Sequence, residues 1–249
     1  MANDIQLIFG KHPLLEALDA GQSVEKIFIQ QGSRGPQIDQ ILQMARQRTI
    51  PLQSMPLAGM NRLTRKNHQG VIAYLALVDY YLVEDVLPTI YDKGEDPLIL
   101  ILDGVSDVRN LGAIARTAYG SGVHALVFPA KHSAQINADA VKASAGALYK
   151  LQLCRSYSLA DSLINLQLSG LTIYALDARA EASPNQVDFS GPAAIVMGGE
   201  GSGLSVQVLK TADHLLHLPI VHDFDSYNVS VATGMVLYEV MRQRMASRT

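Results

Sequence analysis

Three small polar side chains stand at alternate positions where an irregular segment runs into an apolar helix near the end of the chain. They are Ser226, Asn228 and Ser230, and the helix is predicted over residues 229–244. The first turn of a helix leaves backbone N–H groups without partners, so a polar ligand or a reacting oxygen can bind there. We therefore predict a binding site at this helix start. The alternative is an ordinary start that is capped by Ser226 or by Asp225.

A second group of polar residues follows the almost wholly apolar run 98–103, which is typical of a strand buried on both faces. In parallel α/β sheets, ligands bind just beyond the carboxyl ends of the strands. Asn110 fits either the N-cap of a helix predicted over residues 110–120 or a ligand contact. Arg116, inside that helix, either forms an ion pair or uses its planar guanidinium to bind phosphate or ribose.

Four glycines surround Glu200 directly after the apolar strand predicted over residues 193–197. The G-x-G-x-x-G fingerprint of dinucleotide binding fails, because Leu204 stands where the last glycine should be. This failure disfavours a nicotinamide-dependent oxidoreductase. Since Glu200 would also repel a pyrophosphate, the loop suits a cationic or hydroxyl-bearing ligand. A plain tight turn is the alternative.

The histidines do not indicate a metal site. His214 and His217 lie three positions apart on a predicted strand and so point to opposite faces, and His222 follows them. No Cys or paired carboxylate completes a site. The lone Cys154 cannot form an internal disulfide, which fits a small buried side chain in a reducing compartment. We therefore expect no metal and a cytoplasmic location.

The charge of the chain is unevenly distributed. Its 249 residues are 48% hydrophobic and 17% charged, a globular composition with a formal net charge of −3. Residues 1–77 hold 8 Lys/Arg and 5 Asp/Glu, whereas residues 78–96 hold 6 acids and one Lys. The basic front is compatible with a phosphate-rich partner, although a merely soluble surface would explain it equally well. No signal peptide and no apolar run of ~20 residues is found, so no membrane partner is expected.

The pattern of elements predicts two α/β domains. The front domain, 1–77, has predicted helices at 13–19, 37–48 and 57–65, and strands at 24–30, 51–53 and 70–77. Residues 78–96 read as an acidic linker with one short helix at 83–91. In 97–249, further strands at 125–128, 151–154, 171–176 and 214–218 alternate with helices at 138–147 and 159–168. Repeated βα units predict a mainly parallel sheet that is covered on both faces.

Three motifs together resemble the SpoU (TrmH) branch of the SPOUT methyltransferases. They are N-x-G-x-x-x-R-T-A at 110–118, M-G-G-E-G-x-G at 197–203 and S-x-N-V-S-V-A at 226–232. The resemblance covers residues 98–244. The front domain resembles that family's ribosomal-protein-like RNA-binding domain, through I-F-G-K-H-P at 8–13 and N-H-Q-G-V at 67–71.

This resemblance implies an α/β fold whose C-terminal parallel-sheet domain contains a deep trefoil knot, and a homodimer. It implies S-adenosyl-L-methionine as the cofactor and 2′-O-ribose methylation of RNA as the reaction. A guanosine of 23S rRNA is the expected target. A tRNA 2′-O-ribose methyltransferase of the same family and a catalytically inactive RNA-binding protein are the alternatives.

The resemblance also assigns roles to residues. Cofactor contacts are expected from the backbone around four residues and from Ser226; the four are Gly198, Leu218, Ile220 and Tyr227. The predicted catalytic residues are Asn110 and Arg116, which would face the ribose, and Glu200 and Asn228, which would shape the site. Because Tyr227 stands where the family usually has Leu, its larger ring is expected to alter the pocket wall.

Overall fold

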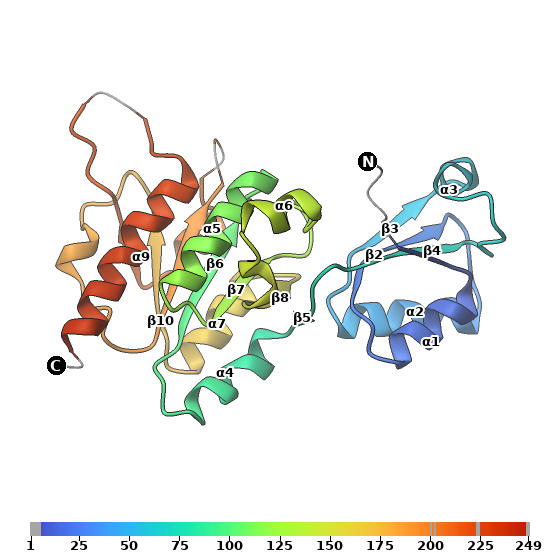
Figure 1. Ribbon diagram of the computed structural model, residues 1–249, viewed down its shortest axis with the longest axis horizontal. Helices are drawn as coiled ribbons and strands as arrows, with labels where there is room; N and C mark the ends of the chain where they lie inside the picture. Colours follow the sequence, from blue (N-terminus) through green and yellow to red (C-terminus); the bar gives the residue numbers. More distant parts are fainter. Residues whose placement is uncertain (1–5, 200, 202, 223–224, 248–249) are drawn as a thin grey trace. The chain divides into compact units, whose positions relative to one another are not determined.

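A computed structural model of the chain describes residues 6–199, 201, 203–222 and 225–247. The chain divides into two compact units, Met1–Asp79 and Tyr80–Thr249 (Figure 1).

The first unit is a four-stranded sheet with helices on both faces. Its elements are β1 (Leu7–Phe9), α1 (Lys11–Asp19), β2 (Val24–Gln30), α2 (Pro36–Gln47), β3 (Leu52–Met55), α3 (Leu57–Leu63) and β4 (Val71–Leu75). The strand order is β1-β4-β2-β3, and β2 and β3 run parallel while the other two pairs are antiparallel. Apolar side chains of α1 and α2 cover one face of the sheet. On the other face, Met60 of α3 packs against Phe28 and Ile72.

The second unit is built on a seven-stranded sheet in which every pair of neighbouring strands is parallel. The strand order is β11-β9-β10-β6-β7-β8-β5. The strands are β5 (Tyr80–Tyr81), β6 (Leu98–Asp103), β7 (Ala125–Pro129), β8 (Gln152–Ser156), β9 (Thr172–Leu176), β10 (Ala193–Gly198) and β11 (His214–Leu216). The predicted α/β fold with a parallel sheet is confirmed.

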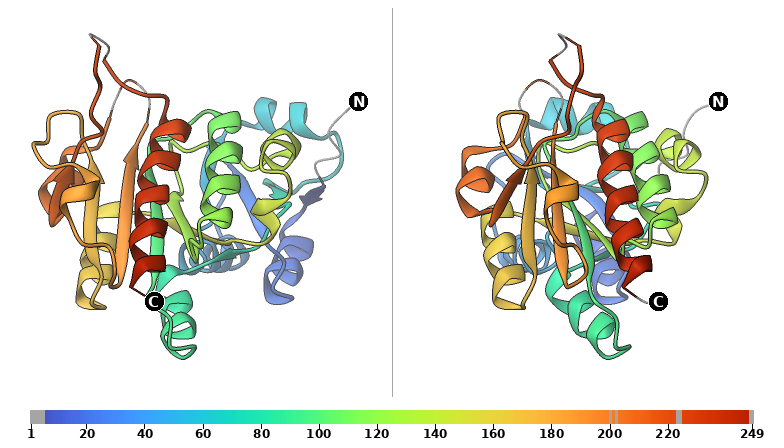
Figure 2. Two further views of the ribbon diagram at one scale, coloured as in Figure 1. Left: turned by 60° about the vertical axis from the view of Figure 1, so that its left-hand side comes forward. Right: turned by 90° about the vertical axis from the view of Figure 1, so that its left-hand side faces the viewer.

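Helices cover both faces of this sheet, as predicted. They are α4 (Val83–Tyr91), α5 (Val108–Gly120), α6 (Ala138–Ala143), α7 (Leu159–Leu168), α8 (Val206–Thr211) and α9 (Val229–Ala246), with the short 3-10 helices η1 (Ala147–Tyr149) and η2 (Pro184–Gln186). Side chains of α4, α7 and α8 form one core with alternate strand residues such as Ile99 and Ile101. On the opposite face α5 and α9 pack side by side (Figure 2). Burial on both faces explains why the central strands are continuously apolar.

Most of the acidic segment 78–96 is part of the second unit and not a linker. β5 pairs with β8, and α4 coincides with the short helix predicted inside this segment. Four side chains of α4 with helical spacing are buried in the core: Val83, Val86, Leu87 and Ile90. This apolar stripe determines the packing of the segment, while its acidic side chains lie on the outer side of the helix.

The trefoil knot stays a prediction, because the loops after β10 and β11 include residues outside the described ranges. Among the described residues, no helix combines the length and the apolar character needed to cross a membrane.

Candidate active site

A pocket of about 650 Å³ lies at the edge of the second sheet where its parallel strands end. The loops after β9, β10 and β11 and the start of α9 form its wall. All of the residues predicted to contact a cofactor line this pocket: Gly198, Leu218, Ile220, Ser226 and Tyr227. Four separate segments of the chain therefore converge where the sequence predicts a ligand site, at the carboxyl ends of parallel strands.

The glycine-rich loop packs closely against the backbone around it. Gly199 donates its N–H to the carbonyl of Asp103 at 2.8 Å and accepts from the N–H of Gly203 at 3.0 Å. A methyl group on Gly199 would lie less than 3.0 Å from the backbone of Gly104, and one on Gly198 would meet the backbone of Gly203. The carboxylate of Asp103 also accepts from the N–H of Ser205 at 2.6 Å. The first two glycines are therefore required by backbone packing, which fixes the shape of this pocket wall.

The variant Gly199→Ala is expected to be less stable by about 2 kcal/mol, since rigid backbone and not a flexible side chain opposes the added methyl group. For a chain of this length the loss corresponds to a fall of roughly 5 °C in Tm, measured by thermal unfolding. Gly191→Ala is the matched control, because no atom lies within 4 Å of the position of its new Cβ. Equal midpoints for the two variants would contradict the close packing of the loop.

Two of the predicted catalytic residues meet although they are 118 positions apart in the sequence. The side-chain amide of Asn228 donates to Oδ1 of Asn110 at 3.1 Å. The Oδ1 atom of Asn228 accepts from the N–H of Ser230 at 3.0 Å and from its hydroxyl at 2.6 Å. Asn228 thus joins the starts of α5 and α9 while it caps α9.

The residues that cap α5 and α9 are not the capping residues that the sequence suggested. The N-cap of α5 is Asp107 and not Asn110, because the Asp107 carboxylate accepts from the N–H groups of Asn110 and Arg109 at 3.1 and 2.7 Å. These bonds, that from Asn110 first, lower the pKa of Asp107. The N-cap of α9 is Asn228 and not Asp225 or Ser226. The Asn110 side chain is thereby directed toward Asn228 instead of capping its own helix.

Tyr227 links the two sides of the pocket wall. Its hydroxyl donates to the carbonyl of Pro219 at 3.1 Å, so the ring spans from the start of α9 to the loop after β11. A leucine at this position has no group to make this bond. The predicted change of the wall therefore takes the form of a hydrogen-bonded ring that is half-buried beside the pocket.

Asp177 and Arg179 also line the pocket, although the sequence motifs do not include them. Arg179 donates from Nε to one carboxylate oxygen of Asp177 at 2.9 Å and from a terminal nitrogen to the other at 2.8 Å. The hydrogen bond from Arg179 lowers the pKa of Asp177. In the sequence, only their position could have indicated that they line a ligand site, since both residues follow directly after β9 at the carboxyl edge of the sheet.

The structure does not bring Arg116 into the pocket. Arg116 is exposed on α5, about 9 Å along the helix axis from Asn110 at 1.5 Å per residue. No hydrogen bond or ion pair joins it to another residue within the described part of the chain, so the ion-pair interpretation finds no support there. Glu200 lies outside the described residues. Those that are described contain no group of three metal-ligating side chains.

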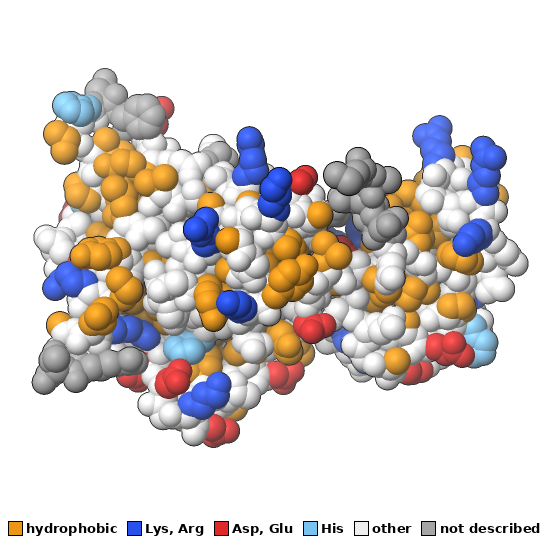
Figure 3. Space-filling model, in the orientation of Figure 1, with side chains coloured by type: hydrophobic (Ala, Val, Ile, Leu, Met, Phe, Trp, Pro, Cys, Tyr) orange, Lys and Arg blue, Asp and Glu red, His pale blue; other side chains and the backbone are white. Residues whose placement is uncertain are grey.

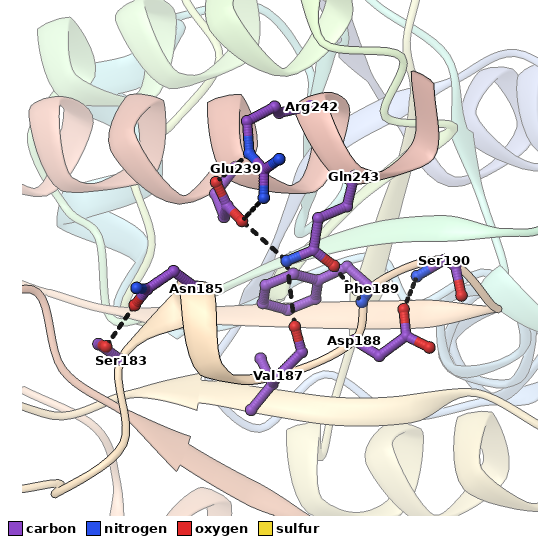
Figure 4. A network of polar contacts seen from close by, with 9 residues as sticks. All are labelled: Ser183, Asn185, Val187, Asp188, Phe189, Ser190, Glu239, Arg242 and Gln243. Carbon is purple, nitrogen blue, oxygen red and sulfur yellow. Dashed lines mark hydrogen bonds and ion pairs between the residues drawn. The ribbon is translucent and has the colours of Figure 1, made fainter. Parts of the chain in front are cut away.

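The far end of α9 is fastened to the segment between β9 and β10 (Figure 4). The Gln243 side chain accepts from the N–H of Phe189 at 2.9 Å and donates to the carbonyl of Val187 at 3.0 Å. Arg242, with help from Gln243, lowers the pKa of Glu239 to about 2, so this carboxylate keeps its bonds at neutral pH. In addition, Arg244 donates to four backbone carbonyls, those of Asp96, Pro97, Phe189 and Gly191. These contacts fix the helix whose first residues form the pocket wall.

Both units match described protein families. Residues 97–238 match the SpoU rRNA Methylase family, and residues 7–81 match the domain described as RNA 2′-O ribose methyltransferase substrate binding.

Individual proteins are similar to this chain over nearly its whole length. The 23S rRNA (guanosine-2′-O-)-methyltransferase RlmB of Xanthomonas campestris is 36% identical over 99% of this chain and 100% of its own length. YacO of Bacillus subtilis, assigned to the TrmH family of tRNA/rRNA methyltransferases, is 31% identical over 98% of both chains. The structure of the SpoU methyltransferase AviRb from Streptomyces viridochromogenes, in complex with the cofactor AdoMet, has a TM-score of 0.60 at 24% identity. That likeness covers 96% of this chain and 90% of AviRb, and concerns the fold.

Proposed function

This chain belongs to the SpoU rRNA methylase family, and from that premise we propose that it transfers a methyl group from S-adenosylmethionine to a ribose 2′-hydroxyl of RNA. The proposed target is a guanosine of 23S rRNA, which is the substrate named for the relative from Xanthomonas campestris. The observation that carries the proposal is the convergence of the three motif regions at one edge of the sheet. There, five predicted cofactor-contact residues line one pocket and Asn110 meets Asn228 beside it.

The pocket fits S-adenosylmethionine in size and chemistry. Its volume of about 650 Å³ falls in the usual range for small-molecule sites. Leu218 and Ile220 offer apolar side chains to a base, while the glycine loop and Ser226 offer polar groups. When bound, this cofactor supplies a methyl group on a sulfonium, which is a good leaving group.

The protein's task is then to align the acceptor hydroxyl and to stabilise the charge that develops on it. We assign alignment to the Asn110–Asn228 pair, since it holds the starts of two helices together beside the pocket. A guanidinium keeps its proton at neutral pH, so Arg116 suits the binding of a phosphate and the stabilisation of the developing alkoxide better than proton removal. Glu200 is proposed to shape the same site.

Mapping of 2′-O-methyl groups in RNA from cells with and without this gene tests the proposal. We expect one guanosine of 23S rRNA to lose its methyl group in the absence of the gene. Loss at a tRNA ribose would move the substrate to tRNA within the same reaction. Unchanged ribose methylation in both RNAs would contradict the proposed activity.

We also propose that the chain forms a homodimer through α9. Val231, Met235 and Tyr238 recur at helical spacing on this helix and are 51%, 43% and 62% exposed. An apolar stripe of this kind on an exposed helix marks a surface that is covered by a partner. α5 lies beside α9 and adds the exposed Tyr119.

The double variant Met235→Glu/Tyr238→Glu is therefore expected to have the mass of a monomer, where the parent has that of a dimer, in light scattering after size exclusion. Two carboxylates in a buried apolar interface would lose their hydration without a partner. Leu168→Glu is the control, because Leu168 is 82% exposed on α7, which covers the other face of the sheet. A dimer that persists in the double variant would place the interface elsewhere.

A further inference from the structure

One face of the sheet in the first unit is covered by a segment that has basic but no acidic residues. The face that carries α3 is basic: residues 57–70 contain Arg62, Arg65 and Lys66, and no Asp or Glu. The opposite face is covered by α1 and α2, which carry the acids Glu16, Asp19 and Asp39 together with the cations Lys11 and Arg46. Figure 3 shows basic side chains gathered over the α3 region and acidic side chains below, over α1 and α2. The α3 face is thus suited to a polyanion.

Two lysines are held on this face by aromatic rings. The Lys66 ammonium lies 5.1 Å from the ring centroid of Phe9, and that of Lys26 lies 5.3 Å from the ring centroid of Phe28. Phe9 and Phe28 both pair with Ile72 in the sheet and project to the side on which α3 packs. A lysine whose stem packs on a ring keeps its ammonium at the surface. No acid of the described residues forms an ion pair with either lysine.

The loop that carries Arg65 and Lys66 is fixed by a buried histidine. Because the N–H of Gly70 donates to Nδ1 of His68 at 3.0 Å, the proton of this imidazole is on Nε2. That Nε2–H donates to Oδ1 of Asn61 in α3 at 3.1 Å. The N-H-Q-G-V motif therefore closes the loop onto α3 and holds its cations in place.

We propose that Lys26, Arg62, Arg65 and Lys66 form a cationic face that binds phosphates of the RNA strand to be methylated. The inference rests on the proposed function, since it takes RNA as the substrate. Clustered cations without acids suit contacts to an RNA backbone, which position the strand without reading its sequence. The match of this unit to a substrate-binding domain favours RNA over an acidic protein.

The test compares two double variants of the full chain that remove equal charge. Arg62→Ala/Lys66→Ala changes the cationic face, and Arg46→Ala/Arg48→Ala removes two exposed cations from the end of α2. Filter binding to a 23S rRNA transcript is measured at several salt concentrations. For the first variant we expect about tenfold weaker binding and a salt slope smaller by about 1.4, which corresponds to two lost phosphate contacts. For the second we expect binding within about twofold of the parent.

Equal losses in the two variants, or none in either, would overturn the cationic face. Both variants are expected to unfold at the temperature of the parent, because all four side chains are exposed, so that weaker RNA binding reports the removed cations and not misfolding of the first unit. If the parent protein methylates no RNA, the proposed function is refuted, but the difference in RNA affinity between the two variants still tests the cationic face. If the parent protein methylates RNA but both variants lose RNA affinity equally, only the cationic face is refuted.

Discussion

Replacement of Arg116 by alanine is expected to lower kcat for methyl transfer by about 10²- to 10³-fold, with unchanged affinity for S-adenosylmethionine. The fall is of the size seen when one donor that stabilises a developing oxyanion is removed. The cofactor affinity is expected to persist because Arg116 is exposed on α5 and does not line the pocket. Single-turnover transfer of a labelled methyl group measures the first quantity, and calorimetry measures the second.

Two further variants test whether the effect depends on the shape of the guanidinium, on its charge, or on the loss of any surface cation. Arg116→Lys keeps a cation but loses the planar fork that binds phosphate in two places, so it is expected to recover only a small part of the activity. Lys210→Ala removes an exposed cation from α8 and is expected to turn over like the parent. Normal turnover by Arg116→Ala would refute a catalytic role of this residue. Weakened binding of S-adenosylmethionine would instead assign it to the cofactor site.

The long elements of the fold were predictable because their apolar patterns are decisive. The predicted bounds of β2 and α7 coincide with the observed ones, and β6 is the buried apolar run that the sequence shows. The sequence did not predict β1 (Leu7–Phe9) or α8 (Val206–Thr211). Such short elements contain less than two periods of the strand or helix pattern, and the elements they pack against decide whether they form. At residues 78–96 the acidic composition led to the prediction of a linker, although the apolar stripe of α4 packs this segment into the second unit.

The site was predictable in its parts but not in its geometry. Motif order indicated that the starts of α5 and α9 belong together, but no local rule predicts that Asn110 and Asn228 share a hydrogen bond. Asp107 and Asn110 are both good capping residues, and only the path of the loop decides that Asp107 caps α5. Asp177 and Arg179 belong to no motif, so only the sheet topology brings them to the pocket.

Asn228 makes two kinds of contact, and two substitutions can separate them. Asn228→Ser keeps an oxygen that caps α9 but is too short to reach Asn110, whereas Asn228→Ala loses both contacts. We expect kcat to fall about 10²-fold in both variants, because the two helix starts lose their alignment beside the pocket. The free energy of unfolding is expected to fall by about 1 kcal/mol in the alanine variant only. Urea unfolding and single-turnover kinetics measure these effects; full activity of the serine variant would reduce Asn228 to a helix cap.

A double-mutant cycle tests whether Asn110 and Asn228 act as one unit. If alignment depends on their mutual hydrogen bond, then Asn110→Ala and Asn228→Ser each remove the same interaction. The double variant is then expected to lose little more activity than either single variant, with a coupling free energy of about 2 kcal/mol in the transition state. Losses that multiply would show instead that each side chain contacts the acceptor independently, since independent contacts add in free energy. Because Asp107 and not Asn110 caps α5, substitution of Asn110 leaves that helix start in place, and the cycle reports on the site.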